Sequence, residues 1–386
     1  MTRVSTRLSL VTAALHLGFG AHLPFFGLWL AERGLTANEI ALVVGAPLFA
    51  RVLGAAPLTA IADQMGDPVL AIRVLSVLVC LLYGAIPFVE GFPGLLLVSV
   101  TAGLLWGTVA PLSDALTIAA TRTGEADYGR VRLWGSFSFI LTASVMGVVI
   151  ERVGLWIVPP MVVLSLLLLM AAVGRRRERS ADPPRSMLDG ARVMARDPVL
   201  LLLLVAAACG HAAHGMFYTI GGVHWRSLGY SEAVIGFLWA VGVIAEIGLF
   251  AISTLVLKRV GTMALLAIGL VAGTVRWAVM AVDPPLGFLF VWQALHAGSF
   301  ACVQAAGIQV VASRFPPALP ASGQGAYFAI VGTFQGLAMI ASGPLYASFA
   351  GQAYLSMAML CLAGLALVTI ASRREAAQPQ RSGSGG

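Results

Sequence analysis

LSLVTAALHLGFGAHLPFFGLWL, residues 8–30, contains no Asp, Glu, Lys or Arg. A helix needs about 20 apolar residues to cross the hydrocarbon of a bilayer, whereas the apolar core of a signal peptide has only about 7–15. This stretch therefore predicts a membrane span. The whole chain of 386 residues is 59% hydrophobic and 11% charged, compared with about 25% charged residues in soluble domains. Such a composition excludes an ordinary soluble fold.

Similar apolar stretches recur along the rest of the sequence. We predict twelve membrane spans, near residues 8–31, 39–62, 69–89, 94–121, 130–150, 155–173, 198–225, 232–257, 262–282, 285–313, 323–349 and 353–371. The expected fold class is all-α integral membrane. The net charge of +7 comes from arginines in short loops between spans, which indicates topology rather than a nucleic-acid partner.

The arginines and lysines fall mostly on one side of the predicted spans. With the N-terminus inside, the other side holds only Arg33, Arg152 and Arg226, and cytoplasmic loops are expected to carry the excess of positive charge. Both termini are therefore predicted to be cytoplasmic. The long polar stretch 174–197 divides the chain into a six-helix bundle (1–173), a cytoplasmic linker, a second six-helix bundle (198–372) and a flexible cytoplasmic tail (373–386).

The two halves of the sequence are related to each other. Matching residues occur at a constant offset (229 − 34 = 195), in the pairs Gly34 and Gly229, Thr36 and Ser231, Ile40 and Ile235, and Gly66 and Gly261. Thr and Ser are typical first residues of helices, and the glycines fall in matching loops. A parallel repeat of two six-helix halves is the architecture of the major facilitator superfamily, whose substrate site lies between the halves near the membrane midplane.

Some charged residues fall deep inside the predicted spans, where a charge costs about 2.5–3.5 kcal/mol on insertion scales. They are Arg51, Asp114, Arg132, Glu246 and Arg276. Arg51 and Glu246 occupy equivalent positions in the two halves (246 − 51 = 195). These residues either form structural ion pairs that hold helices together, or they surround a polar cavity that binds solute and moves a proton.

Histidines also fall well inside predicted spans, namely His16, His22, His211, His214 and His296. Each could be a hydrogen-bonded core residue or a group that touches substrate or proton. His211 and His214 are spaced to share one helix face, but no carboxylate is nearby in the sequence, so we predict no metal site. The four cysteines lie within apolar stretches without CxxC spacing and are interpreted as packing residues.

Several short motifs resemble the phenylpropionate permease group of the major facilitator superfamily over nearly the whole chain. They are LPFF at 23–26 with Trp29, ARVLG at 50–54, PLSDAL at 111–116, DYGRVRLWGS at 127–136, AE at 245–246, VRW at 275–277 and LH at 295–296. This resemblance implies a bacterial, multi-pass transporter of the inner (plasma) membrane. It further implies a monomer whose partners are a small-molecule substrate, protons and the lipid bilayer, with no cofactor and no nucleic acid. In this superfamily the first, fourth, seventh and tenth spans line the cavity, which would place His16, His22, His211, His214 and His296 on lining helices.

A more distant resemblance to lactose permease and the oligosaccharide/proton symporters assigns roles to individual residues. In that family a carboxylate and an arginine eighteen positions later hold the sugar, and Asp114 and Arg132 have this spacing (132 − 114 = 18). The aromatic residue that stacks on the sugar matches Phe139. With His22, His214 and Arg51, these are the predicted substrate-binding residues.

The proton-coupling cluster of that family is matched only in part. Glu246, Arg276 and His296 resemble its acidic, basic and histidine members. The carboxylate that releases the proton in the sugar symporters is Ser299 here. Coupling by that residue is therefore impossible in this chain, and Glu246 or a histidine is expected to carry the proton instead.

These observations favour a proton-coupled symporter for a small organic solute, with an aromatic carboxylate such as 3-phenylpropionate or cinnamate as the expected substrate. An exporter or facilitator for another solute, such as a sugar or nucleoside, is the alternative. The fifth span has no proline between residues 135 and 150, whereas drug/proton antiporters carry a glycine-proline motif there, so uptake is favoured over efflux. A multispan membrane enzyme is disfavoured, because no HExxH motif, nucleophile-base pair or close carboxylate pair is present.

Overall fold

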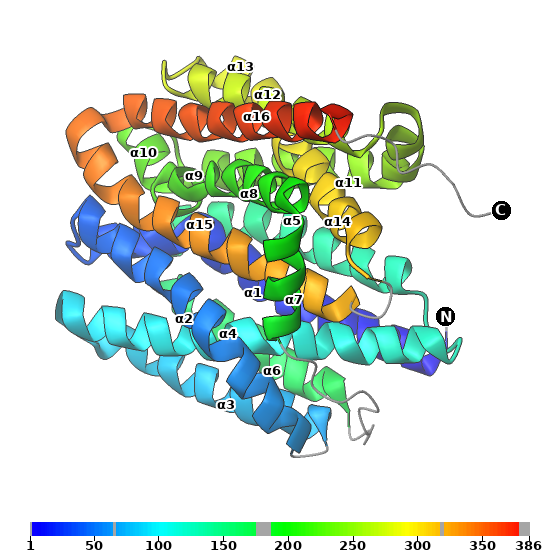
Figure 1. Cartoon of the computed structure of the whole chain (residues 1–386). Helices are drawn as coiled ribbons and strands as arrows, with labels where there is room; N and C mark the ends of the chain where they lie inside the picture. Colours follow the sequence, from blue (N-terminus) through cyan, green and yellow to red (C-terminus); the bar gives the residue numbers. More distant parts are fainter. Residues whose placement is uncertain (1, 65–66, 175–186, 317–319, 378–386) are drawn as a thin grey trace.

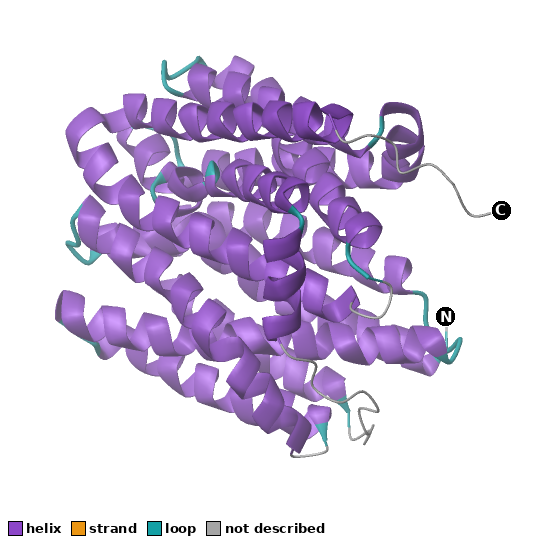
Figure 2. Cartoon of the chain, viewed as in Figure 1, coloured by secondary structure: helices purple, strands orange, loops and turns teal. Residues whose placement is uncertain are grey.

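A computed structural model describes residues 2–64, 67–174, 187–316 and 320–377 (Figure 1). Over these ranges the chain is helical and contains no strand (Figure 2). The helices are α1 (Arg3–Glu32), α2 (Ala37–Gln64), α3 (Pro68–Ala85), η1 (Ile86–Phe88), α4 (Gly91–Arg122), α5 (Tyr128–Val153), η2 (Leu155–Ile157), α6 (Val158–Val173), α7 (Met187–Arg196), α8 (Pro198–Ala212), α9 (Gly215–Thr219), α10 (Gly221–Ser227), α11 (Glu232–Val260), α12 (Thr262–Met280), α13 (Leu286–Gln293), η3 (Ala297–Cys302), α14 (Val303–Arg314), α15 (Pro320–Phe349), η4 (Ala350–Ala353) and α16 (Tyr354–Ala377).

The helices in the described residues confirm the predicted membrane spans. Eleven segments are long and apolar enough to cross a bilayer, and the last of them, Ser322–Ala377, contains both α15 and α16. Each of these two helices is itself of membrane length, with 30 and 24 residues. The chain therefore makes twelve membrane-length passages, and the all-α membrane fold is confirmed.

The two predicted repeats adopt the same local structure where they match in sequence. Gly34 and Gly229 have backbone φ angles of +82° and +85°, a region that favours glycine because it has no Cβ. Ser231 accepts a hydrogen bond from the Val234 N–H at the start of α11, and Thr36 accepts one from the Glu39 N–H at the start of α2. The 195-residue offset therefore marks a structural repeat at this turn. Gly66, the partner of Gly261, lies outside the described residues.

The helices on either side of the polar linker pack mainly among themselves. In Figure 1, α2, α3, α4 and α6 lie at the bottom, and α12, α13 and α16 lie at the top. In the first part α1 packs on α5 and α6, and in the second part α16 packs on α8 and α12. The two parts meet where α2 packs on α15 and where α5 packs on α11.

Glycines bring the two parts into close contact at the end of the molecule near Gly34 and Gly229. A Cβ atom added to Gly236 of α11 would lie 2.2 Å from the Ala143 carbonyl oxygen of α5. A Cβ added to Gly147 would lie 2.3 Å from the Glu232 carbonyl oxygen. Only glycine permits such separations, so this end of the interface is closed by direct backbone packing.

Three features differ from the sequence prediction. The seventh passage is split into α8, α9 and α10, and the tenth into α13, η3 and α14. The polar linker includes a helix, α7, which packs against α15 and α8. The last helix continues to Ala377, so residues 373–377, expected in a flexible tail, are helical. Residues 175–186 of the linker and 378–386 of the tail lie outside the described residues.

Candidate functional site

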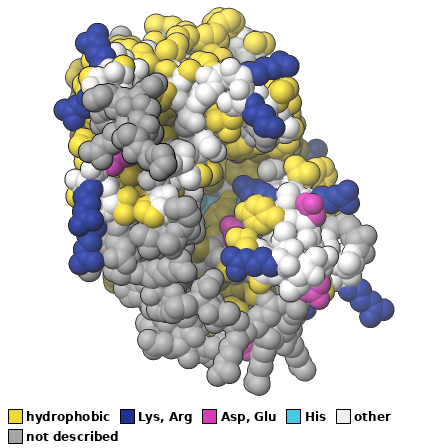
Figure 3. All heavy atoms as spheres, turned by 45° about the vertical axis from the view of Figure 1, so that its right-hand side comes forward, with side chains coloured by type: hydrophobic (Ala, Val, Ile, Leu, Met, Phe, Trp, Pro, Cys, Tyr) yellow, Lys and Arg dark blue, Asp and Glu magenta, His cyan; other side chains and the backbone are white. Residues whose placement is uncertain are grey.

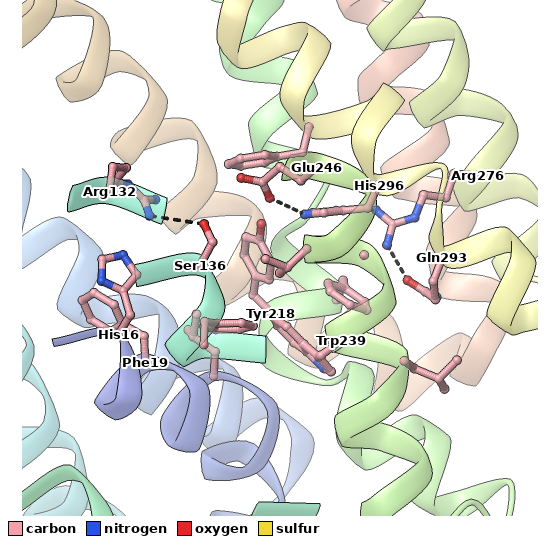
Figure 4. Close-up of a pocket in the computed structure, with 17 residues that line it drawn as sticks. His16, Phe19, Arg132, Ser136, Tyr218, Trp239, Glu246, Arg276, Gln293 and His296 are labelled. Carbon is pink, nitrogen blue, oxygen red and sulfur yellow. Dashed lines mark hydrogen bonds and ion pairs between the residues drawn. The ribbon is translucent and has the colours of Figure 1, made fainter. Parts of the chain in front are cut away.

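A cavity of about 210 Å³ lies between the two parts of the chain (Figure 4). Its walls come from α1 and α5 on one side and from α9, α11, α12, α13 and η3 on the other. The residues that line it are His16, Phe19, Leu23, Arg132, Ser136, Phe139, Phe217, Tyr218, Leu238, Trp239, Gly242, Val243, Glu246, Arg276, Gln293, His296 and Phe300. Figure 3 shows a hollow in the face that turns toward the viewer, with Lys and Arg side chains near its rim.

On the α1 and α5 side the cavity wall carries a guanidinium group. Arg132 is partly buried, and Nη1 donates a long hydrogen bond of 3.5 Å to the Ser136 hydroxyl. Within the described chain no carboxylate lies within 4.0 Å of this guanidinium. His16, also in the wall, hydrogen-bonds the Thr12 carbonyl through Nδ1 at 2.8 Å. Because a carbonyl only accepts, Nδ1 carries the proton, and Nε2 of the neutral ring is left as an acceptor.

On the opposite side a hydrogen-bonded chain runs from a buried cation to the cavity wall. Arg276 is fully buried, and its Nη1 lies 3.1 Å from Nδ1 of His296. A guanidinium only donates, so His296 Nδ1 accepts and the proton of the neutral ring is on Nε2. This Nε2 lies 3.4 Å from Oε2 of Glu246. The Arg276 contact thus fixes the tautomer of His296 and directs its N–H at the carboxylate.

A branch of this chain leads through Ser299 to α8. Arg276 Nη1 also donates to the Ser299 hydroxyl at 3.2 Å, and that hydroxyl lies 3.3 Å from Nε2 of His214. Since His214 Nδ1 donates to the Gly210 carbonyl at 3.0 Å, its Nε2 accepts from Ser299. Ser299 therefore holds a place in the hydrogen-bond network where the sugar symporters carry a carboxylate.

Neutral groups contact the rest of the Arg276 guanidinium, whose buried Nε–H has no hydrogen-bond partner among the described residues. Nη2 donates to Oε1 of Gln293 at 2.7 Å. The guanidinium carbon lies 4.3 Å from the ring centroid of Trp277 and 5.2 Å from that of Phe217. Aromatic faces attract cations, so these rings offset part of the cost of burying the charge. Most N–H groups of Arg276 are committed, whereas those of Arg132 are not.

Aromatic side chains form the remaining wall between the two polar sides. Trp239 stacks on Phe217 with centroids 4.5 Å apart and on Tyr218 at 5.8 Å. Phe139 of α5 lies 6.4 Å from Trp239 in a tilted arrangement. A flat apolar ligand could therefore lie against several rings at once, in the offset and edge-on geometries that aromatic pairs prefer.

Breaks in two helices place the polar groups at this wall. The seventh passage is interrupted at residues 213–214, so Tyr218 belongs to the five-residue helix α9 instead of continuing α8. In the tenth passage His296 immediately precedes η3, a π-helix that contains Ser299 and Phe300. π-Helical turns are frequent at functional sites because they re-aim side chains, and discontinuous helices form the substrate sites of many transporters.

The cavity brings together five of the residues predicted as substrate-binding or proton-coupling groups. Arg132, Phe139, Glu246, Arg276 and His296 all line it. They come from α5, α11, α12 and the start of η3, so the fifth, eighth, ninth and tenth passages contribute. The fourth passage, which the resemblance placed among the lining spans, contributes no described residue to this cavity.

The other four predicted binding residues do not line the cavity. Asp114 lies on α4 and makes no ion pair within 4.0 Å with Arg132, although the sequence pairs them. His22 lies in an aromatic cluster, stacked on Phe26 at 4.3 Å. His214 lies behind the wall, bonded to Ser299. Arg51 is exposed and packs beside Gly107 of α4, because α2 faces α4 and α15 and not this cavity.

The sequence interpretation did not include several lining residues, of which Tyr218, Trp239, Gln293 and Ser136 bear polar groups. Tyr218 and Gln293 lie beside helix breaks that no proline marks in the sequence. Ser136 is the last residue of the DYGRVRLWGS motif, and its position one helical turn after Arg132 is a signal that could have identified it.

The fold and the cavity define a multispan membrane transporter, and comparisons with known proteins agree. The model of the MFS_1 like family matches residues 7–357. The chain therefore belongs to this family and is a secondary transporter of the major facilitator type, not an enzyme.

Relatives of known name and structure extend this result. The chain is 30% identical over 304 residues to the Escherichia coli (strain K12) protein named "Probable 3-phenylpropionic acid transporter", covering 77% of this chain and 79% of that protein. It is 23% identical over 368 residues to the maltose permease of Geobacillus stearothermophilus, covering 92% of each. The crystal structure of the nucleoside transporter NupG aligns with a TM-score of 0.80 at 16% identity, covering 96% of this chain and 98% of that one. This last likeness shows the fold alone.

Proposed function

We propose that this transporter takes up a small aromatic carboxylate together with a proton. The observation that carries the proposal is the Arg132 guanidinium, which lines the cavity with only a long hydrogen bond to Ser136. A guanidinium binds a carboxylate through two parallel N–H donors. Arg276 is less suited to this task, because His296, Ser299 and Gln293 already accept its hydrogen bonds.

The rest of the cavity supports an aromatic substrate of small size. Phe139, Phe217 and Trp239 offer ring faces and edges to a bound aryl group. The cavity volume of about 210 Å³ is below the roughly 300–1,000 Å³ of sites for drug-sized ligands. The relative named as a phenylpropionic acid transporter supports the same substrate class.

We place the protein in the bacterial inner membrane with both termini in the cytoplasm, as the distribution of arginines predicts. Figure 3 turns the right-hand side of Figure 1 forward, where α1 begins and α16 ends, and the hollow is on this face. At the other end, the Ala233 N–H donates to Glu151 Oε1 at 3.1 Å beside the glycine contacts of α5 and α11. This arrangement corresponds to an inward-open state of alternating access.

Glu246 is the proton-coupling group in this proposal. Among the described residues that line the cavity it is the single carboxylate, and it faces the N–H of His296. His296 is held neutral as long as its Nδ1 accepts from Arg276, because protonating that nitrogen would break the contact. Glu246 can therefore exchange a proton with the cavity while the hydrogen bonds from Arg276 through His296 hold the Glu246 side chain in place.

Uptake by reconstituted protein tests the substrate class. Purified transporter in liposomes is loaded with unlabelled solute, and counterflow is measured with labelled 3-phenylpropionate, cinnamate, a disaccharide and a nucleoside. Counterflow of the aromatic acids alone is expected. Counterflow of the sugar or the nucleoside without the acids would refute the proposal.

Replacing Glu246 with Gln tests proton coupling. Gln keeps the shape of the side chain but cannot carry a proton, so Glu246→Gln should abolish accumulation driven by an imposed pH gradient and retain energy-independent exchange. Glu90→Gln is a matched control, because Glu90 is exposed before α4 and makes no capping hydrogen bond. Accumulation by Glu246→Gln against a substrate gradient would make Glu246 a structural partner of His296.

A further inference from the structure

The wall of the cavity formed by α9, α11, α12, α13 and η3 bears polar groups that an unsubstituted aryl ring would leave without partners. Glu246 contacts His296 through Oε2, and within the described chain Oε1 has no hydrogen-bond partner. The Tyr218 hydroxyl likewise has no hydrogen-bond partner among the described residues, and its ring stacks on Trp239 and on His214, with centroids 5.8 Å apart in each pair. Figure 4 shows the Tyr218 hydroxyl pointing toward the side of the cavity on which Glu246 lies.

These two groups lie across the cavity from the proposed carboxylate anchor. Arg132 and Ser136 belong to α5, whereas Tyr218 and Glu246 belong to α9 and α11. A substrate whose carboxylate binds Arg132 would direct its aryl end at this second polar site. An unsubstituted phenyl ring would displace water from the carboxylate and the hydroxyl without replacing its hydrogen bonds, which is costly for buried polar groups.

We infer that the preferred substrate is a hydroxylated aryl carboxylic acid, whose ring hydroxyl donates to Glu246 and accepts from Tyr218. This inference rests on the proposed function and deepens it by naming specificity-determining residues. A ring hydroxyl provides one donor and acceptor lone pairs, which match a carboxylate oxygen and a tyrosine O–H. A site built to hydrogen-bond a substrate hydroxyl discriminates strongly against the analogue that lacks it, because its own polar groups are then unpaired.

Half-saturation concentrations for counterflow test this inference in liposomes. The probes are 3-phenylpropionate, 3-(3-hydroxyphenyl)propionate and 3-(4-hydroxyphenyl)propionate. At least one hydroxylated acid should half-saturate at a concentration about tenfold or more below that of 3-phenylpropionate. Tyr218→Phe should reduce this ratio severalfold, because it removes one of the two partners. Tyr230→Phe, a tyrosine outside the cavity wall, should leave the ratio unchanged.

Three other outcomes would refute the hydroxyl site, the role of Tyr218 or the proposed function itself. Half-saturation of all three acids within about twofold of one another would refute the hydroxyl site and leave aromatic acid transport standing. A preference that is the same in Tyr218→Phe as in the unsubstituted protein would remove Tyr218 from the recognition site. If none of the three acids shows counterflow, both the proposed function and this inference are refuted.

Discussion

Arg132→Lys is the substitution that most directly tests the proposed anchor. Lysine keeps the positive charge but replaces the planar pair of donors by a single ammonium group. The substrate carboxylate would then lose one of two charge-assisted hydrogen bonds, worth about 1.5–3 kcal/mol. This corresponds to binding weaker by roughly 10- to 150-fold. The folded protein loses only the 3.5 Å contact with Ser136, so stability should fall by about 1 kcal/mol or less.

The assay is the dissociation constant of an aromatic acid, from quenching of tryptophan fluorescence in detergent, together with the midpoint of thermal unfolding. Arg130→Lys is the matched control, because Arg130 is exposed two residues earlier on α5 and does not line the cavity. A dissociation constant for Arg132→Lys within about twofold of the original value, at unchanged thermal stability, would place the carboxylate elsewhere.

Three further predictions address the fold and its opening. Gly236→Val should force α5 and α11 apart, since a Cβ there lies 2.2 Å from the Ala143 carbonyl oxygen; uptake should fall, and a cysteine introduced at Leu23 should react faster with an impermeant maleimide added outside cells. Arg276→Met should lower the unfolding free energy by about 3 kcal/mol or more, because its buried acceptors lose their donors; an unchanged melting temperature would contradict this. A cysteine at Arg185 should react with the same reagent only after cells are permeabilised, and reaction in intact cells would reverse the predicted topology.

The number and order of the membrane passages could be predicted from the sequence, because an apolar run of sufficient length has no stable alternative to crossing the bilayer. The repeat could be predicted as well. Gly34 and Gly229 require the same left-handed backbone, and Thr36 and Ser231 start equivalent helices, so local chemistry alone marked the matching turns.

The composition of the cavity wall could be predicted only in part. The spacing of Asp114 and Arg132 matches that of the sugar-binding pair in the oligosaccharide/proton symporters, but spacing does not show which face of each helix meets the other. In the structure the two residues make no ion pair. Arg51 and Glu246 are equivalent in the repeat, yet one is exposed beside α4 and the other lines the cavity. The two residues differ in how their helices are rotated and in which helices pack against them. Neither property is set by neighbouring residues in the sequence.

The sequence by itself determined the membrane fold, the two related halves and the presence of intramembrane charges, because each follows from hydropathy, charge or the backbone requirement of one residue. Only the tertiary structure decided how these charges are used. The breaks at residues 213–214 and before η3 bring Tyr218 and His296 to one wall, and the buried Arg276 then fixes the tautomer of His296. The hydrogen bonds of this network join residues up to 85 positions apart, as between His214 and Ser299, and no local pattern specifies which donor meets which acceptor.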